Sequence, residues 1–378
     1  MKILFFSTYF HPYISGITTY PHTIFNYLAQ NNEITVLTFP HKKDLSKTET
    51  IDKINVIRMP YALNISKGFI SPQSLFYFLK YVKDTDCVIL NIPNFEGFLL
   101  ALIAKLYGKK ILSIYHCEVF LTSSPLSRLI NIVLNTSVHL QLSLSHKIIA
   151  YTKDYAEHTG LTNRYKDKVL YSYPPVEILK IKPMDETELR QEKNGIWIGF
   201  AGRTAREKGI EFLIEAIYKL KNKDITLVFA GPFGKDVVGE EDYYEYILSQ
   251  LKKYSIKYKF LGNLKESQLG AFYKVIDLLV LPSINSTEAF GMVQIDALLL
   301  GTPVIASNLP GVRIPVQETK MGIITQPKNS DELSAAINQI ITNKSHYTNQ
   351  ILTTNARNIF DIHNIYKFFD RLLHSLQS

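Results

Sequence analysis

Cysteine is scarce in this chain of 378 residues, which contains only Cys87 and Cys117. The two lie far apart and in no spacing typical of a metal site. A chain of this length can bury a large core, so neither disulfides nor a structural metal are needed for stability. We therefore expect reduced thiols, as in a cytoplasmic protein.

Long apolar runs are also lacking. No run reaches the roughly 18 residues of a membrane-spanning helix. The apolar stretch Ile3 to Phe6 is too short for a signal peptide, and His11-Pro12 interrupts it. We expect a cytoplasmic protein that is soluble or peripheral, in the second case at the inner face of the membrane.

Motifs of several other protein classes are missing. We find no zinc-finger spacing, no basic helix with heptads and no aromatic ribonucleoprotein pattern, so we expect no nucleic-acid partner. No G-x-G-x-x-G follows the first apolar run, which gives no support for a dinucleotide cofactor. No Asp-x-Asp motif stands at the end of a predicted strand. We expect no cofactor and no metal.

The composition indicates a globular protein, with 46% hydrophobic and 20% charged residues. Its charge is uneven: the first 182 residues hold 20 Lys and Arg against 12 Asp and Glu, which accounts for the whole net charge of +8. This excess favours an anionic partner such as a phospholipid surface, a lipid phosphate or an anionic glycan. A plain solvated surface is the alternative, because the basic residues are scattered.

Apolar strands alternate with helices along the chain, which predicts an α/β fold with parallel sheets covered on both faces. The stretch Tyr173-Pro174-Pro175-Val176 breaks this pattern, and polar residues 177–194 follow it. We place the linker here. The prediction is one α/β domain at 1–178 and a second at 179–360.

Two positions of the first half are candidates for ligand contact. Ser15 and Gly16 lie in the loop after the first strand, where Gly16 would allow the backbone to approach a ligand. A simple loop glycine is the alternative. His116 directly follows the strand Lys110 to Tyr115, where a histidine can meet a phosphate or hydroxyl. A structural histidine is the alternative.

The second half restarts with the strand Ile196 to Ala201, followed by G-R-T-A-R-E-K-G and a helix. Arg203 and Lys208 lie in this loop, where an Arg fork and a Lys point charge can hold a diphosphate. Surface cations near a turn are the alternative.

The most informative stretch is Ser286 to Ala306, STEAFGMVQIDALLLGTPVIA. It reads as an acidic loop after a strand, a helix from Met292 to Leu300, a Gly-Thr-Pro turn and a new strand. A helix start offers backbone N–H groups to an anion. The alternative is an ordinary strand-helix-strand unit in which Glu288 caps the helix.

These motifs together resemble family 4 retaining glycosyltransferases. The resemblance rests on Glu-x-Phe-Gly at Glu288, the acid eight positions later, Ala-x-x-x-Gly-x-Pro-Val-Ile-Ala, and G-R-x-x-x-x-K-G at Arg203. It implies the GT-B arrangement, with two facing Rossmann-like domains, at 1–178 and 179–360, and a central cleft. It also implies that the final helix, at 361–378, returns to the first domain. The chain departs from the family pattern at Asp296, where Glu is usual, and at Ser15, where Gly is usual.

The resemblance implies a role for each candidate. His116 and Glu288 would be catalytic, and Ser15 and Gly16 would form the acceptor or phosphate loop. The residues that would bind the donor are Arg203, Lys208, Gly231, Ala289, Phe290, Gly291, Met292, Val293 and Asp296.

The hypothesis is a retaining, metal-independent hexosyltransferase that uses a UDP- or GDP-sugar and a glycan or lipid-linked acceptor in cell-envelope polysaccharide or glycolipid synthesis. Peripheral membrane contact would involve the basic N-terminal domain. The alternatives are a sugar-nucleotide epimerase on the same plan, a sugar phosphorylase, and a catalytically weak nucleotide-sugar-binding or scaffold protein.

Overall fold

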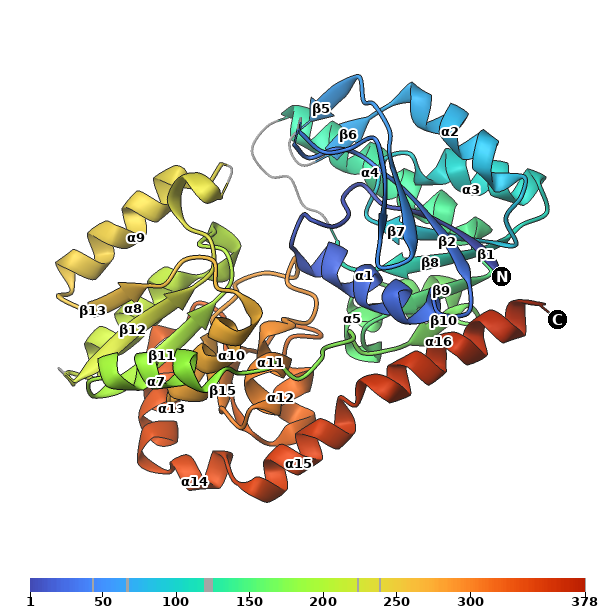
Figure 1. Cartoon of the computed structure of the whole chain (residues 1–378). Coiled ribbons are helices and arrows are strands. Elements are labelled where there is room, and N and C mark those ends of the chain that lie inside the picture. Colours follow the sequence, from blue (N-terminus) through green and yellow to red (C-terminus); the bar gives the residue numbers. More distant parts are fainter. Residues whose placement is uncertain (43, 66–67, 119–124, 223, 238, 378) are drawn as a thin grey trace. The chain divides into compact units, whose positions relative to one another are not determined.

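The computed structural model describes residues 1–42, 44–65, 68–118, 125–222, 224–237 and 239–377 (Figure 1). The chain forms two compact units, Met1–Pro175 with Ile362–Ser378, and Val176–Asp361.

The first unit is built on an eight-stranded sheet with the order β10-β9-β8-β7-β1-β2-β4-β3. Its strands are parallel except β3, which pairs antiparallel with β4. The strands are β1 Lys2–Phe6, β2 Glu33–Thr38, β3 Thr48–Ile51, β4 Ile54–Arg58, β7 Cys87–Ile92, β8 Lys110–Tyr115, β9 Lys147–Ala150 and β10 Val169–Tyr171. A separate hairpin joins β5 Leu63–Ile65 and β6 Gly68–Ile70.

Helices cover both faces of this sheet, because its strands are apolar on both sides. Leu4 and Phe6 of β1 belong to a core cluster with α2 and α3, whereas Phe5 packs edge-on against Phe25 of α1. The helices of this unit are α1 Gly16–Leu28, α2 Pro72–Val82, α3 Gly97–Leu106, α4 Pro125–Leu144, α5 Lys153–His158, α6 Leu161–Tyr165 and α16 Ile362–Gln377.

The final helix α16 lies against α1 within the first unit (Figure 1). The ring of Tyr366 stacks on Tyr27 with centroids 4.1 Å apart, and the Tyr27 hydroxyl donates a hydrogen bond of 2.6 Å to Asp370. Phe369 is fully buried and approaches the ring of Tyr20. The C-terminal segment is therefore part of the core of this unit.

The second unit contains a six-stranded parallel sheet with the order β13-β12-β11-β14-β15-β16. Its strands are β11 Ile196–Ala201, β12 Ile225–Ala230, β13 Lys257–Phe260, β14 Leu278–Leu281, β15 Val304–Ser307 and β16 Gly322–Thr325. Its helices are α7 Pro183–Glu192, α8 Ile210–Lys219, α9 Glu241–Lys253, α10 Glu266–Val275, α11 Val293–Leu299, α12 Ile314–Thr319, α13 Ser330–Thr342, α14 Lys344–Tyr347 and α15 Gln350–Ile359, with 3-10 turns at Arg206–Lys208 and Gly234–Asp236.

One segment differs from the linker expected at residues 177–194. Helix α7 forms there, although none of its residues is buried. Pro183 occupies its first turn, two acidic residues follow, and Glu186 forms an ion pair of 2.7 Å with Arg190 one turn later. End effects, this charge pair and contacts with α10, where the Ser267 hydroxyl donates to Asp185, stabilise the helix. It therefore has no apolar periodicity for the sequence to reveal.

The α/β class and the parallel sheets agree with the prediction. Among the described residues, no helix combines the length and apolar character needed to cross a membrane.

Candidate functional site

The candidate site of the second unit lies at the carboxyl end of its sheet, where the strand order reverses. Strand β11 pairs with β12 on one side and β14 on the other. The chain leaves these neighbouring strands in opposite directions, so the loops after β11 and β14 border the position where ligands of doubly wound sheets bind. The first loop carries Arg203 and Lys208, and the second carries Glu288.

Glycines bring the two loops together. Gly209 has a φ of 61°, and a Cβ built there would lie 2.5 Å from the Pro282 carbonyl oxygen. The amide of Ile284 donates a hydrogen bond of 3.0 Å to the Glu207 carbonyl, which ties the loops directly. Only glycine combines this conformation with so close a contact. The backbone therefore fixes the spacing between the two sets of charged side chains.

Arg203 and Lys208 of the first loop are each paired with a carboxylate. Lys208 forms a short ion pair with Glu288, and each of these side chains is only 15% exposed. The Ser283 hydroxyl donates a second hydrogen bond, of 3.3 Å, to Glu288. Arg203 lies nearer to solvent and pairs with Glu207 at 2.9 Å. A diphosphate arriving here would meet a fixed Lys and a more mobile Arg fork.

Ala289 and Phe290 are buried, unlike their charged neighbours. The Phe290 ring lies edge-on to Phe360, so this side chain belongs to the core. Gly291 follows with a φ of 76°, and a Cβ there would lie 2.3 Å from Leu281. These three residues can contact a ligand through their backbone only.

Met292 and Val293 are half-buried at the beginning of α11, where Met292 is the N-cap. Asp296 lies one turn further and is also half-buried. Burial raises the pKa of this carboxyl to about 7, and the neighbouring Tyr273 hydroxyl opposes the shift. Asp296 therefore changes charge near neutral pH.

Gly231 directly follows β12 at this edge of the sheet. Its amide donates a hydrogen bond of 2.8 Å to Gly262, and a Cβ there would lie 2.4 Å from the Gly202 carbonyl oxygen. The sequence did not predict the aromatic group beside it. The Phe233 and Phe260 rings lie 4.7 Å apart, and both contact Tyr244. The feature of the sequence that could have indicated this group is Phe233, an aromatic residue two positions after Gly231.

The first unit has a corresponding edge, because its strand order reverses between β1 and β7. Asn91 of β7 donates hydrogen bonds to the Ser7 hydroxyl at 2.9 Å and to the Ile17 carbonyl at 3.1 Å. Asn91 thereby joins β7 to the loop and helix that follow β1, where Ser15 and Gly16 lie.

His116 is buried beside Asn91. Its Nε2 lies 2.5 Å from Asn91 Oδ1, and its Nδ1 forms a short hydrogen bond with the Tyr151 hydroxyl. Since the Asn91 amide nitrogen is already donating elsewhere, Nε2 donates to Asn91 and Nδ1 accepts from Tyr151. Burial lowers the pKa of His116 to about 3. The imidazole is therefore neutral and held at both nitrogens.

Ser15 is the N-cap residue of α1, and Gly16 is its first helical residue. The Ser15 amide donates a hydrogen bond of 3.0 Å to the Thr18 hydroxyl, which in turn donates to the Tyr13 carbonyl. The loop is thus fixed by its own hydrogen bonds, with Gly16 exposed at the start of the helix.

The sequence did not identify the partners that fix these side chains. Asn91, Tyr151 and Ser283 each lie at or just beyond a strand end, whereas Glu207 lies in the 3-10 turn that follows β11. Position near a strand end was the signal available for the first three.

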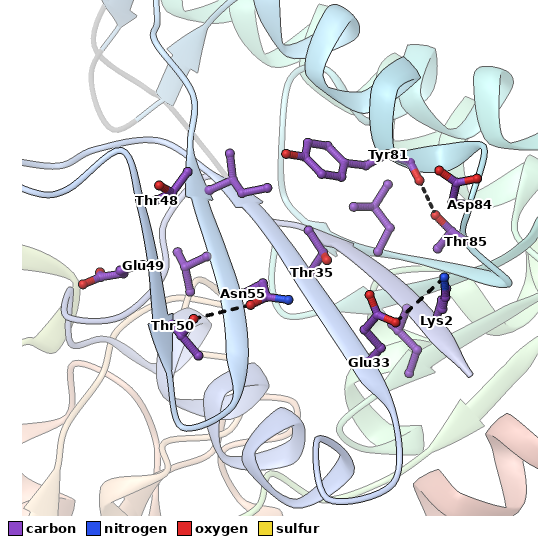
Figure 2. A pocket seen from close by; sticks show the side chains of 14 residues that line it. Lys2, Glu33, Thr35, Thr48, Glu49, Thr50, Asn55, Tyr81, Asp84 and Thr85 are labelled. Carbon is purple, nitrogen blue, oxygen red and sulfur yellow. Dashed lines mark hydrogen bonds and ion pairs between the residues drawn. The ribbon is translucent and has the colours of Figure 1, made fainter.

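A separate hollow of about 620 Å³ lies over β1 to β4 of the first unit (Figure 2). Glu33, Glu49, Thr35 and Asn55 are among its polar lining residues. None of the predicted site residues lines it. It is an open polar surface whose lining cation, Lys2, lies 3.9 Å from Glu33, whereas the loop after β11 offers the cations Arg203 and Lys208.

In the part of the chain that the structure describes, no group of three or more His, Cys, Asp or Glu residues could hold a metal ion.

Residues 182–358 match the family model for glycosyl transferases group 1. An uncharacterised glycosyltransferase of Methanocaldococcus jannaschii is 34% identical over 146 residues, which are 38% of this chain and 35% of that protein. The lipopolysaccharide 1,2-N-acetylglucosaminetransferase of Salmonella typhimurium is 29% identical over 179 residues, 45% of this chain and 46% of that protein. This chain thus spans less than half the length of these two curated relatives.

The crystal structure of Anabaena HepE in complex with UDP is similar over almost the whole length. Its TM-score is 0.80 at 21% identity, and the match covers 99% of this chain and 100% of HepE. The chain therefore has the GT-B glycosyltransferase fold, with a parallel sheet in each unit. The assignment to family 4 stays a prediction.

Proposed function

We propose that this protein is a retaining glycosyltransferase that transfers a hexosyl group from a nucleotide-diphosphate sugar to a glycan or lipid-linked acceptor. The observation that carries the proposal is the group formed by Arg203, Lys208 and Glu288 on the loops after β11 and β14. Two cations beside a carboxylate at the reversal of a parallel sheet suit a diphosphate joined to a sugar.

The donor is a UDP- or GDP-sugar in this proposal. HepE was crystallised with UDP and with UDP-glucose, which favours the uridine nucleotide. Arg203 and Lys208 would bind the diphosphate, Asp296 the ribose hydroxyls and Glu288 the sugar. The aromatic group around Phe233 offers ring faces for the base.

The chemical step would proceed without a covalent intermediate on the protein. The acceptor oxygen forms a bond to the anomeric carbon as the bond from that carbon to the β-phosphate oxygen breaks. The acceptor proton passes to the leaving phosphate. Negative charge grows on the diphosphate during this step, so Arg203 and Lys208 stabilise the transition state more than the bound donor.

His116 acts in this proposal as a neutral positioning group. Its lowered pKa and its two hydrogen-bond partners disfavour a role as a general base near neutral pH. A ligand hydroxyl would have to exchange with Asn91 or Tyr151 to reach the imidazole. The acceptor would bind at this edge of the first unit, beside Ser15 and Gly16.

The acceptor belongs to cell-envelope polysaccharide or glycolipid synthesis in this proposal, and the protein would act at the inner face of the membrane. The Salmonella relative, named for lipopolysaccharide, supports this class of acceptor. The excess of basic residues in the first half of the sequence also suits an anionic or lipid-linked acceptor.

The first test is thermal stabilisation by UDP-, GDP- and ADP-sugars, measured together with slow hydrolysis of each. A ligand at 100 times its dissociation constant should add about 2.7 kcal/mol to the free energy of unfolding. We expect one base to give a large shift with sugar released. Absence of any shift would contradict nucleotide binding at this site.

A catalytically weak nucleotide-sugar-binding protein is the second candidate, favoured by the raised pKa of Asp296 and the fully engaged His116. The variant Glu288→Gln separates the two. In an active transferase it should bind UDP at least as tightly, because Lys208 is released for the diphosphate, and lower transfer by about 100-fold or more. A protein that binds the donor without releasing or transferring sugar would support the weaker function.

A further inference from the structure

Helices α2, α3 and α4 of the first unit carry large apolar side chains in solvent. The three helices lie side by side on one face of the first sheet, with α2 against α3 and α3 against α4 (Figure 1). Phe76 is 81% exposed and Leu106 is 77% exposed. The exposed apolar side chains of this face are Phe76, Leu79, Leu99, Leu102, Leu106, Leu129, Ile132, Val133 and Leu140.

Within each helix these residues form a stripe. In α3, Leu99, Leu102 and Leu106 follow at spacings of three and four, so they project from one side. The opposite side of α3, with Leu100, packs in the core under the sheet. The stripes therefore face outward, and the folding of this unit does not require them to be apolar.

The same helices contain no acidic residue. The sequences of α2, α3 and α4 include Lys80, Lys105 and Arg128 but neither Asp nor Glu. All three cations are exposed. Acidic residues occur only beside the helices: Glu96 precedes α3 and accepts a hydrogen bond of 2.7 Å from the Ser71 amide. The face thus combines apolar side chains with a single sign of charge.

The second unit shows that this combination is not a general property of the chain. Its exposed apolar residues, such as Tyr218, Tyr246 and Ile351, lie singly on different helices. Helix α9 carries Glu241, Asp242 and other charges of both signs. Scattered exposed residues of that kind are normal, whereas a grouped set indicates an interaction surface.

We propose that the α2–α3–α4 face docks on an anionic lipid bilayer, with its apolar side chains inserted at the headgroup level and its cations near lipid phosphates. Charge complementarity selects this partner, because the face offers cations and apolar groups without a carboxylate. None of the three helices is able to span the bilayer by the criterion of length and apolar character. This inference deepens the lipid-linked acceptor of the proposed function.

The test is flotation of the full chain with vesicles, without any nucleotide sugar. Vesicles of phosphatidylcholine with about 30% phosphatidylglycerol should bind the protein at least about tenfold more tightly than pure phosphatidylcholine, and high salt should weaken this binding. Equal binding to the two vesicles, or binding to neither, would overturn the proposal.

Two variants locate the surface. Phe76→Ser with Leu106→Gln and Ile132→Gln should lower vesicle binding about tenfold or more, because three inserted apolar side chains are removed. Ile351→Gln is the matched control, since this residue is also 81% exposed but belongs to the second unit. It should bind vesicles like the unchanged protein. A similar loss of vesicle binding in the triple variant and in Ile351→Gln would mean that another surface binds the vesicles.

Nucleotide-induced thermal shifts separate this inference from the proposed function. The triple variant should keep the shift given by the preferred nucleotide sugar, which also shows that it is folded. If the unchanged protein binds vesicles but no nucleotide sugar raises its melting temperature, the docking proposal stands and only the proposed transferase function is contradicted. A third outcome is that neither protein binds vesicles, and that the unchanged protein forms a dimer whereas the triple variant is a monomer. The α2–α3–α4 face would then be a dimer interface, and the proposal would be wrong.

Discussion

Lys208 and Glu288 form an ion pair although 80 positions separate them in the chain. The pair joins the loop after β11 to the loop after β14, and both side chains are largely buried. The two motifs that stand out in the sequence therefore meet as one charged group. A ligand diphosphate would compete with Glu288 for Lys208, so occupation of the site is coupled to this contact.

The pair should show strong coupling in a double-mutant cycle. Lys208→Ala leaves the Glu288 carboxylate with only the Ser283 hydroxyl, which should lower the free energy of unfolding by about 1–3 kcal/mol. Glu288→Ala should cost a similar amount, and the double variant less than the sum of the two. Urea unfolding of the four proteins measures this. Strictly additive losses would mean that the contact contributes nothing to stability.

Arg203 should contribute to diphosphate binding and little to folding. Arg203→Ala removes a charged donor pair, so the dissociation constant for UDP should rise about 10- to 100-fold. Uridine, which has no phosphate, should bind both proteins equally. Isothermal titration calorimetry measures the dissociation constants for UDP and for uridine.

Arg190 provides the control for Arg203. It forms the same kind of pair one helical turn apart, with Glu186 at 2.7 Å, on α7 of the same unit. Arg190→Ala should leave UDP affinity unchanged, because exposed pairs of this kind contribute little. Equal UDP affinity in the Arg203 and Arg190 variants would remove Arg203 from the site.

The sequence predicted most of the strands, because most of them are apolar runs bounded by turn residues. Residues 196–201 were expected as a strand and form β11 over the same range. Strand β3, Thr48–Ile51, was missed, because its residues alternate between exposed and half-buried and lack an apolar run. Its pairing with β4 depends on a neighbour that only the folded sheet supplies.

The sequence named the candidate residues of the site but not the contacts between them. Motif spacing identified Lys208 and Glu288, yet their pairing requires β11 and β14 to be neighbours in the sheet. The environment of His116 was not predictable either, since Asn91 and Tyr151 come from strands on its two sides. Side-chain partners of this kind are set by long-range packing, which local patterns do not encode.

Asp296 should make nucleotide binding depend on pH near neutrality. With a pKa of about 7, its carboxyl is charged above this pH and accepts hydrogen bonds from ribose hydroxyls best in that form. The affinity for UDP-glucose, whose diphosphate stays fully ionised in this range, should therefore fall as the pH is lowered from 8 to 6. Asp296→Asn should bind more weakly at pH 8 and lose this dependence. An unchanged pH profile in the variant would contradict the role of Asp296.

The Asp296 carboxyl should have the opposite effect on the stability of the fold, which should decrease as the pH rises. Its pKa in the folded protein is above the usual value of 3.8, so the folded state holds the proton more strongly and becomes less stable as the pH rises towards 7. The cost at pH 8 is at most about 4 kcal/mol at 1.4 kcal/mol per pKa unit. Asp296→Asn should thus gain stability relative to the unchanged protein between pH 5 and pH 8, as urea unfolding would show.

His116 should make the first unit sensitive to acid. Its pKa in the folded protein is about 3, below the usual 6.5, so the unfolded chain binds the proton first as the pH falls. Stability from neutral His116 is present above pH 6.5 and is lost progressively below it, by up to about 5 kcal/mol near pH 3. The unchanged protein should therefore lose more stability between pH 7 and pH 4 than His116→Gln, whose side chain does not titrate.

The variant His374→Gln is the control for the removal of a histidine, since His374 is exposed. Its stability should change with pH like that of the unchanged protein. Parallel curves for the two variants would mean that His116 is protonated in the folded state, and its Nδ1 would then donate to the Tyr151 hydroxyl and no longer accept from it.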